Sequence, residues 1–593
     1  MRVADYIFKT LADYGVKHVF MVSGGGAMHL NDALGKEKRI KYICNHHEQA
    51  CAIAAEGYAR VTNTPGVICV TTGPGGTNAL TGVIGAWLDS IPMIIVSGQV
   101  KFETTIASCP ELGLRQLGDQ ELNIVDVVKP ITKYAAMVTD GTRIKYHLEK
   151  AWHLATSGRP GPVWLDIPMN IQASELASEE MASFTPPSEP VYSISDQIKS
   201  LTEMLAASNR PVILSGHGIR LANAISPFEE LINKLRIPVL STFNGMDIVS
   251  TSDPLAIGKV GTIGTRAGNF TLQNADLVIC IGTRNNIRQA SYNWENFAKR
   301  AKLAVVDIDE RELNKPTVVP DLKIHSDARY FIEQLTMQLD QLELPDWSSW
   351  LNWAQQRKEK YPALLPEYSE VKDGINPYYF TDCLTAVVDS DSIIVSTNAT
   401  PSIALFQAGN IQKGQRAFAN SGCASMGYGL PAALGAACVK RNQVICLEGD
   451  GSLMMNLQEL QTVSSYNLPV KLFLFNNSDY TSIRLTQDAF FKGDYCGCTL
   501  DSGVTFPDWK HIASAFGFEY IELESTSNLK EAVLRIVSSP GRVFCNVKLC
   551  EKYIFQPKTS SKKLPDGSMQ SSPLEDMFPF LDEAELKSNI IAD

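Results

Sequence analysis

Two short apolar runs, each followed at once by polar residues, constrain the fold of this chain most. The run 444–447 predicts a buried strand and leads into Gly449-Asp450-Gly451. The run 470–475 predicts a second buried strand and leads into Asn476-Asn477. Glycines on both sides of an acid let the backbone turn sharply and come close to a ligand. The pattern is typical of two parallel strands whose carboxyl ends form a binding site.

Asp450 and Asn477 are 27 residues apart, and the stretch 453–468 between the two strands has a helical composition. One strand–helix–strand crossover accounts for this spacing and brings both side chains to the same edge of a parallel sheet. A carboxylate and an amide oxygen are hard ligands that suit Mg2+. The alternative is an Asx-turn at one strand end and a helix cap at the other. The spacing favours the metal site.

Three blocks of alternating short strands and helices follow one another along the chain. This alternation predicts an α/β fold with three doubly wound parallel-sheet domains. We place the domains at residues 1–175, 195–345 and 373–550. A Ser-, Pro- and Glu-rich linker is expected at 177–193. Residues 551–593 are polar and predict an extended tail with a short acidic helix at its end.

The composition argues against several classes of partner. The net charge of -11 and the pI near 5.5 do not suit nucleic acid or an anionic membrane surface. No apolar run reaches the roughly 18 residues of a membrane span, and the first residues lack the pattern of a signal peptide. Thirteen scattered cysteines without a CxxC pair suit a reducing compartment. We therefore expect a cytoplasmic protein that binds neither nucleic acid nor membrane.

Further motifs resemble those of one enzyme family. They are Glu48-Gln49-Ala50, Thr72-Gly73-Pro74-Gly75-Gly76-Thr77-Asn78, Gly422–Ala433 and the two strand ends described above. Together they closely resemble the thiamin diphosphate-dependent enzymes, in particular the catalytic (large) subunit of the acetolactate synthase branch. The resemblance implies a pyrimidine-binding, a central and a diphosphate-binding domain. It also implies a homodimer or homotetramer, with each active site between the first domain of one subunit and the third domain of another.

The resemblance implies two catalytic residues in the first domain. Glu48 would contact N1' of the cofactor aminopyrimidine and shift the ring to the imino tautomer, which deprotonates C2 of the thiazolium. This role needs a carboxylate in a dry site, and the alternative is a favourable charge at a helix N-terminus. Gln120 is the second residue, in a Gln-Glu pair that the family shares. His46 and His47 have no third ligand at a zinc-like spacing, so we expect no metal there.

The same resemblance assigns the contacts of thiamin diphosphate and its Mg2+. Met426 would hold the cofactor in its bent shape, and the backbone oxygen of Ala424 would accept from its 4'-amino group. The other expected cofactor contacts are Gly73, Asn78, Asn398, Thr400, Gly449, Gly451, Ser452 and Ile483, and the expected metal ligands are Asp450, Asn477 and Asp479. Thr400-Pro401 stand where close relatives have a Gln-His pair.

In the central domain, Gly282-Thr283-Arg284 and Asp307-Ile308-Asp309 each follow an expected strand. Such positions bind FAD, without a net redox role, in the acetolactate synthase branch. The resemblance implies that Arg284 contacts the flavin side, with Gly282 beside it, and that Asp307 or Asp309 lies near the adenosine. The alternatives are a surface arginine and helix-capping acids.

The implied reaction starts from a 2-keto acid such as pyruvate. The cofactor adds to the keto carbon, CO2 leaves because the thiazolium is an electron sink, and the two-carbon unit attacks a second carbonyl. With pyruvate as donor and acceptor, the product is acetolactate. Asp119, Ser482 and Thr486 stand where close relatives have bulky apolar residues, which indicates a wider and more polar acceptor pocket.

Two alternative functions stay open. The polar acceptor pocket and the tail motif Leu564–Met569 resemble relatives that add an acetyl unit to larger ketones, including nucleotide-linked keto sugars. A non-catalytic thiamin diphosphate-binding homologue is the second alternative, and the presence of Glu48, Asp450 and Asn477 argues against it. The tail is interpreted either as a disordered terminus or as a lid over the active site.

Overall fold

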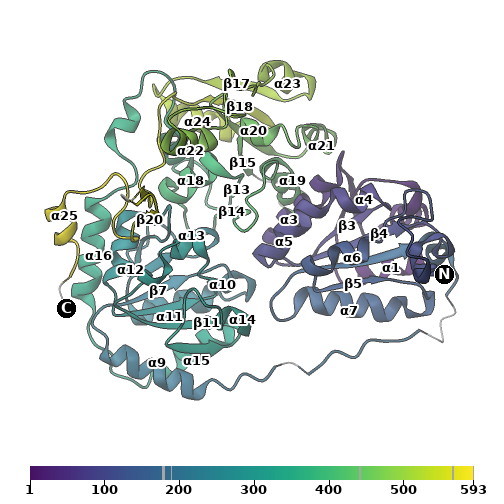
Figure 1. The fold of residues 1–593 in the computed structure, drawn as a ribbon, viewed down its shortest axis with the longest axis horizontal. Helices are drawn as coiled ribbons and strands as arrows, with labels where there is room; N and C mark the ends of the chain where they lie inside the picture. Colours follow the sequence, from purple (N-terminus) through teal and green to yellow (C-terminus); the bar gives the residue numbers. More distant parts are fainter. Residues whose placement is uncertain (177–180, 189, 440–442, 564–565, 592–593) are drawn as a thin grey trace.

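The structure is a computed structural model and describes residues 1–593 apart from 177–180, 189, 440–442, 564–565 and 592–593. It contains three six-stranded parallel sheets with flanking helices (Figure 1). The predicted α/β fold with three doubly wound domains is confirmed. In the described part of the chain, no helix is long and apolar enough to cross a membrane.

The first domain is built on a sheet with the strand order β2-β1-β3-β4-β6-β5. Its strands are β1 (His18–Met21), β2 (Lys41–Cys44), β3 (Gly66–Val70), β4 (Met93–Gln99), β5 (Tyr134–Met137) and β6 (Pro162–Pro168). Its helices are α1 (Val3–Asp13), α2 (Met28–Lys36), α3 (Glu48–Thr62), α4 (Pro74–Asn78), α5 (Leu80–Asp89), α6 (Ile124–Val128), α7 (Ile144–Thr156) and α8 (Met169–Ala173). Every residue of β3, β4 and β6 is buried, as expected for parallel strands covered on both faces.

The central domain has the strand order β12-β11-β10-β7-β8-β9. Its strands are β7 (Pro211–Ser215), β8 (Val239–Ser241), β9 (Ala256–Lys259), β10 (Leu277–Ile281), β11 (Lys302–Asp307) and β12 (Leu322–His325). Its helices are α9 (Ser195–Ala207), α10 (Gly218–Leu221), α11 (Ile225–Leu235), α12 (Arg266–Asn274), α13 (Ile287–Ala290), α14 (Glu310–Leu313), α15 (Ala328–Leu339) and α16 (Ser348–Lys360). The strand order reverses between β7 and β10, and such a switch point is where open α/β sheets bind ligands.

The third domain has the strand order β14-β13-β15-β16-β18-β17 and reverses between β13 and β15. Its strands are β13 (Ile393–Ser396), β14 (Arg416–Ala419), β15 (Val444–Gly449), β16 (Val470–Asn476), β17 (Glu519–Leu523) and β18 (Val543–Lys548). Its helices are α17 (Pro377–Thr385), α18 (Ala399–Ala408), α19 (Gly429–Val439), α20 (Asp450–Leu453), α21 (Glu459–Ser465), α22 (Thr481–Phe491), α23 (Trp509–Ala515) and α24 (Leu529–Ser538). The two apolar runs that constrain the sequence are the neighbouring parallel strands β15 and β16.

The helix expected at 453–468 is wrong in its extent. The structure has two short helices there, α20 and α21, with an irregular stretch between them. Asn456 lies in this stretch, and its side-chain amide donates to the carbonyl of Gly427 at 2.7 Å. This hydrogen bond ties the chain after β15 to the loop before α19.

The expectation of a disordered terminus is wrong for the described residues of the tail, while a lid over an active site between two subunits stays a prediction. The tail forms a hairpin of β19 (Ser561–Lys563) and β20 (Met569–Ser571) and ends in the predicted short helix, α25 (Glu583–Ser588). Leu574 is buried in the core of the central domain, and α25 lies beside α16 (Figure 1). In the linker, the described residues 181–188 and 190–193 form no helix or strand, and the remainder lies outside the described residues.

Helices α3 and α19 pack closely where the first and third domains meet (Figure 1). A Cβ atom on Gly57 would lie 2.2 Å from the carbonyl oxygen of Ala432, and one on Gly435 would lie 1.9 Å from that of Ala54. Only glycine leaves room for such an approach. These two pairs also show that the helices run antiparallel, because the residue number rises along one helix as it falls along the other.

We predict that Gly57→Ala destabilises the protein by about 1–3 kcal/mol, because the new methyl group overlaps the α19 backbone. Gly35→Ala in α2 is the matched control, since no atom lies within 4 Å of its added Cβ; there alanine should be neutral or stabilising by up to about 1 kcal/mol. Thermal unfolding of both variants measures the difference. Equal midpoints for the two variants would show that the crossing tolerates the methyl group.

Candidate active site

The loops that follow β13, β14 and β15 meet at the switch point of the third sheet. The Ser452 hydroxyl lies 2.6 Å from the hydroxyl of Thr397 and accepts a hydrogen bond from the backbone of Gly427 at 2.8 Å. Ser452 thus holds the three loops together in this structure. A Cβ atom on Gly451 would lie 2.2 Å from the Tyr480 ring and 3.3 Å from the Met426 methyl group, so these side chains line the same spot.

Asp450 is a buried carboxylate at the N-terminus of α20. It accepts three backbone hydrogen bonds, from Gly451 at 2.7 Å, Ser478 at 2.7 Å and Asn477 at 3.1 Å. Burial raises the pKa of Asp450 to about 7, although the hydrogen bonds act in the opposite direction. A cation beside Asp450 would favour its ionised form, because an opposite charge lowers the pKa of a carboxyl group.

The Asn477 side chain has one end of its amide toward Asp450 and the other away from it. The first end lies 3.2 Å from Asp450 Oδ2 and 2.9 Å from the carbonyl oxygen of Asp479. The second end lies 2.8 Å from Tyr553 Oη and 2.7 Å from Thr481 Oγ1. The Asp479 carboxylate is turned away from Asp450, to Arg484 at 2.5 Å and to the Thr481 hydroxyl. Asp479 therefore faces the site with its backbone oxygen only.

Two alanines near this site have left-handed backbone conformations. Ala399 has φ of 52° and Ala424 has φ of 53°, a region that costs an L-residue about 1–2 kcal/mol. The Asn420 side chain accepts hydrogen bonds from the backbone of Cys423 and Ala424, at 3.0 and 3.2 Å, and so supports the second of these conformations. Asn398 precedes α18 as its N-cap residue, and Ile483 is exposed on α22.

The predicted residues of the first domain form a separate group around Glu48. Glu48 is buried at the first turn of α3, and its carboxylate accepts from the Asn78 amide at 3.0 Å. Gly73 has φ of 58°, and a Cβ atom there would lie 2.4 Å from the Gln120 carbonyl. The structure thus joins the loops of Gly73 and Gln120. His47 caps α3 through Nδ1, which accepts from the backbone of Gln49 at 3.1 Å.

Within one chain, Glu48 lies far from the Met426 group. Gly57 faces Ala432 across the antiparallel crossing of α3 and α19. Glu48 is nine residues before Gly57 and so lies about 13 Å along α3 from this contact. Met426 lies beyond the other end of the crossing, just before α19. The two groups of predicted residues therefore do not form one site within a single chain.

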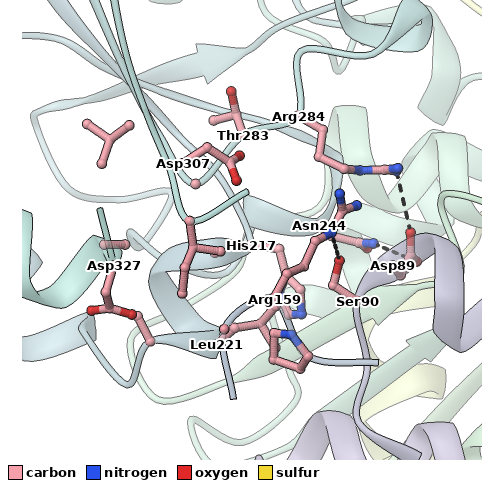
Figure 2. Close-up of a pocket in the computed structure, with 18 of the residues that line it drawn as sticks. Asp89, Ser90, Arg159, His217, Leu221, Asn244, Thr283, Arg284, Asp307 and Asp327 are labelled. Atoms are coloured by element: carbon pink, nitrogen blue, oxygen red, sulfur yellow. Dashed lines mark hydrogen bonds and ion pairs between the residues drawn. The ribbon is translucent and has the colours of Figure 1, made fainter. Parts of the chain in front are cut away.

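A cavity of about 820 Å³ lies where the three domains meet (Figure 2). The ends of β7 and β10, at the switch point of the central sheet, contribute His217, Gly282, Thr283 and Arg284 to its wall. Asp89 of the first domain and Ser421 of the third also line it. Its volume lies within the range of about 300–1,000 Å³ that is usual for small-molecule sites.

The central-domain predictions differ in their outcome. Gly282, Arg284 and Asp307 line the cavity, and burial raises the pKa of Asp307 to about 6. Asp309 does not line it; it caps α14 and pairs with Arg159 at 3.1 Å. Of the two acids predicted here, Asp307 is the one that lines the cavity.

Asp89 and His217 are cavity residues that sequence reasoning missed. Asp89 accepts from Arg60 at 2.6 Å, from Asn244 at 3.1 Å and from the backbone of Ser421 and Gly422 at 3.0 and 2.9 Å. Neither ring nitrogen of His217 has a hydrogen-bond partner among the described residues. The glycines on both sides of His217, directly after a strand, are a sequence signal for a ligand-binding loop. The sequence carries no such signal for Asp89.

Comparison with known proteins identifies the family. Models of the thiamine pyrophosphate enzyme N-terminal TPP binding domain, central domain and C-terminal TPP binding domain match residues 1–123, 198–335 and 400–547. Acetolactate synthase isozyme 1 large subunit of Escherichia coli K12 is 31% identical over 548 residues, which cover 92% of this chain and 93% of the relative. The chloroplastic acetolactate synthase of Arabidopsis thaliana is 32% identical over 92% of this chain and 81% of the relative. The acetolactate synthase large subunit of Lactococcus lactis is 31% identical over 89% of each chain.

The chain belongs to the thiamin diphosphate-dependent enzymes, whose cofactor is also called thiamine pyrophosphate. Its similarity to these relatives over about nine tenths of its length makes it a carboligase of the acetolactate synthase type. The family resemblance predicted from the sequence motifs is thereby confirmed.

Proposed function

We propose that the enzyme decarboxylates pyruvate and joins the remaining two-carbon unit to a keto acceptor, with acetolactate as the product when the acceptor is a second pyruvate. When bound, thiamin diphosphate supplies a nucleophilic carbon and an electron sink. The observation that carries this proposal is Glu48, a buried carboxylate held by Asn78 at 3.0 Å. A carboxylate fixed in a dry site is suited to exchange a proton with a ring nitrogen. Gln120, beside Gly73, is the second residue proposed for the reaction.

The edge of the third sheet is proposed to hold Mg2+ and the diphosphate. The Thr481 hydroxyl has a single proton and donates it to the Asp479 carboxylate. Toward Asn477 the hydroxyl can therefore only accept, so the amide nitrogen of Asn477 faces it. The amide oxygen then faces Asp450 Oδ2 and the Asp479 carbonyl. Three oxygens that face one another repel unless a cation lies between them, and this donor set suits Mg2+. Met426, Ala424 and the loops of Asn398, Thr400, Gly449, Gly451 and Ser452 would hold the cofactor nearby.

The separation of Glu48 from Met426 supports an active site shared between two subunits. Each site would combine Glu48 of one copy with Asp450 and Met426 of the other, in a homodimer or homotetramer. All thirteen cysteines, each in the described part of the chain, are free thiols. This supports a reducing compartment such as the cytoplasm.

We predict that Glu48→Gln lowers the rate by roughly 10²–10⁴, the usual contribution of a positioned proton-transfer group, and that Asp450→Ala prevents Mg2+-dependent cofactor binding. Each variant alone should release CO2 from pyruvate at no more than about 1% of the wild-type rate. The two variants, co-expressed with different tags and purified as mixed dimers, should recover about half of the wild-type activity, because one of the two sites is intact.

Mixed dimers that are as inactive as the single variants would show that each site forms within one chain. A wild-type protein that binds the cofactor but releases no CO2 from pyruvate, with any acceptor offered, would instead identify a non-catalytic homologue. Unchanged C2 hydrogen exchange of the cofactor in Glu48→Gln would remove Glu48 from the mechanism.

The cavity between the domains is proposed to bind FAD. Its polar wall carries Arg284, suited to an anionic group, and Asp307, suited to a ribose hydroxyl (Figure 2). His217 supports a ligand there, because a buried imidazole without a partner is costly unless a bound molecule hydrogen-bonds it. Burial and nearby arginines hold the pKa of His217 well below its usual value, so the ring is neutral and offers one donor and one acceptor.

We predict that the purified protein is yellow and releases intact FAD on denaturation. Arg284→Ala should lower flavin affinity about 10–100-fold, since hydrogen bonds to charged groups contribute about 1.5–3 kcal/mol. Exposed Arg115→Ala is the control. A colourless protein that takes up no FAD on reconstitution would place the chain among flavin-free relatives, whatever the outcome at Glu48.

The acceptor region is proposed to combine Asp119 of one subunit with α22 of another. Asp119 is exposed on a loop of the first domain. Thr486 is exposed on α22, and its hydroxyl donates to the Ser482 carbonyl at 3.0 Å. Polar side chains here give little apolar contact to a small 2-keto acid. They favour pyruvate or a larger, hydroxyl-bearing ketone as the acceptor.

We predict that 2-ketobutyrate is not preferred over pyruvate as acceptor, and that Thr486→Trp shifts the preference toward 2-ketobutyrate. Each methylene-scale contact in such a pocket contributes on the order of 1–3 kcal/mol to discrimination. Competition between the two acids, with both products quantified, measures the shift. Asp488→Trp, on the opposite side of α22, is the control, and a strong wild-type preference for 2-ketobutyrate would contradict the polar pocket. A keto-sugar nucleotide in the same assay tests the larger-ketone alternative.

A further inference from the structure

The orientation of the Asn477 amide determines whether the third sheet presents a cation site. With its oxygen toward Asp450, the amide adds a ligand to the carboxylate and to the Asp479 carbonyl. With the opposite orientation, the amide nitrogen would donate to Asp450 at 3.2 Å and to the Asp479 carbonyl at 2.9 Å. The second orientation satisfies both oxygens without any cation and withdraws one ligand. The magnesium site proposed above therefore requires that the protein favour the first orientation.

Thr481 is the first residue that favours the orientation with the Asn477 oxygen toward Asp450. It is 2% exposed, and its hydroxyl lies between the Asp479 carboxylate and the Asn477 amide. A carboxylate only accepts, and the Asp479 carboxylate also receives Arg484 at 2.5 Å. The single hydroxyl proton of Thr481 is thus used on Asp479, and Thr481 can only accept from Asn477. An amide oxygen at this position would face a lone pair.

Tyr553 is the second group, and it comes from the segment that follows the third sheet. Its hydroxyl lies 2.8 Å from the same end of the Asn477 amide and 2.9 Å from Thr400 Oγ1. The hydroxyl of a tyrosine is protonated at neutral pH, so Tyr553 has one proton to donate. When Tyr553 donates to Thr400, it accepts from the Asn477 nitrogen.

We propose that Thr481 and Tyr553 are positioning residues that hold the Asn477 amide with its oxygen toward the cation at Asp450. This inference rests on the magnesium site proposed above and extends it to two residues that do not touch the ion. Arg484 and the Asp479 carboxylate act behind Thr481 by occupying its proton. The segment after residue 550 then contributes to the metal site through Tyr553, although most of the tail packs on the central domain.

The test measures metal affinity rather than activity. Mg2+ is titrated into each protein at saturating thiamin diphosphate and followed by calorimetry. Thr481→Val and Tyr553→Phe should each weaken the apparent Mg2+ affinity about 10–100-fold, as is usual for groups that orient a metal ligand. Thr481→Ser keeps the hydroxyl and should bind like the wild type. Tyr520→Phe is the matched control, since its hydroxyl contacts Glu522 and Asn546 in the β17–β18 pair at the edge of the same sheet.

The thermal midpoint of the metal-free proteins separates positioning from a general packing role. Tyr553→Phe should lower the metal-free midpoint no more than Tyr520→Phe does, while the rise on adding Mg2+ and cofactor should shrink in Tyr553→Phe alone. Unchanged Mg2+ affinity in both Thr481→Val and Tyr553→Phe, with normal Mg2+-dependent binding in the wild type, would overturn the inference and leave the proposed function intact. A wild type whose cofactor binding does not depend on Mg2+ would overturn the metal site and the inference together.

Discussion

The buried charge cluster at Asp89 is the interaction on which the arrangement of the three domains depends. Arg60 donates to Glu56 at 2.8 Å and to Asp89 at 2.6 Å, and the side chains of all three are essentially inaccessible to water. Buried ion pairs are stable only when the remaining polar atoms are also satisfied. Asp89 meets this requirement with Asn244 of the central domain and the backbone of Ser421 in the third, whereas Nη1 of Arg60 has no hydrogen-bond partner among the described residues. One carboxylate thus contacts every domain.

The α3–α19 crossing beside this cluster fixes how the predicted catalytic groups are distributed. Because the two helices run antiparallel with glycines at the contact, the N-terminus of α3 points away from the start of α19. Glu48 and Met426 are therefore held at opposite ends of the same rigid contact. The cluster also lies between the central cavity and the backbone of Gly422, which leads into Met426. Asp89 therefore lines the cavity and also binds the backbone of the loop that leads to Met426.

At the edge of the third sheet, residue identity predicts which residues come together but not which of their atoms face the site. The motif around Asp450 and its spacing to Asn477 predict a shared strand edge, and the structure has β15 and β16 side by side. The family resemblance predicts Asp479 as a metal ligand but does not specify which of its oxygen atoms binds. The carboxylate of Asp479 accepts hydrogen bonds from Arg484 and Thr481, and only its backbone carbonyl oxygen faces Asn477. That distinction depends on the turn between β16 and α22.

The sequence by itself determined the fold class, the family and the groups around Glu48 and Asp450, because strand periodicity, glycine turns and motif spacing are local properties of the chain. The tertiary structure decided what depends on contacts between distant segments. The place of Asp89 in a three-domain cluster, the docking of the tail on the central domain and the approach of Tyr553 to Asn477 have no local signal. They arise because a buried polar group must find a partner, and the partner can come from any part of the chain that packing brings within reach.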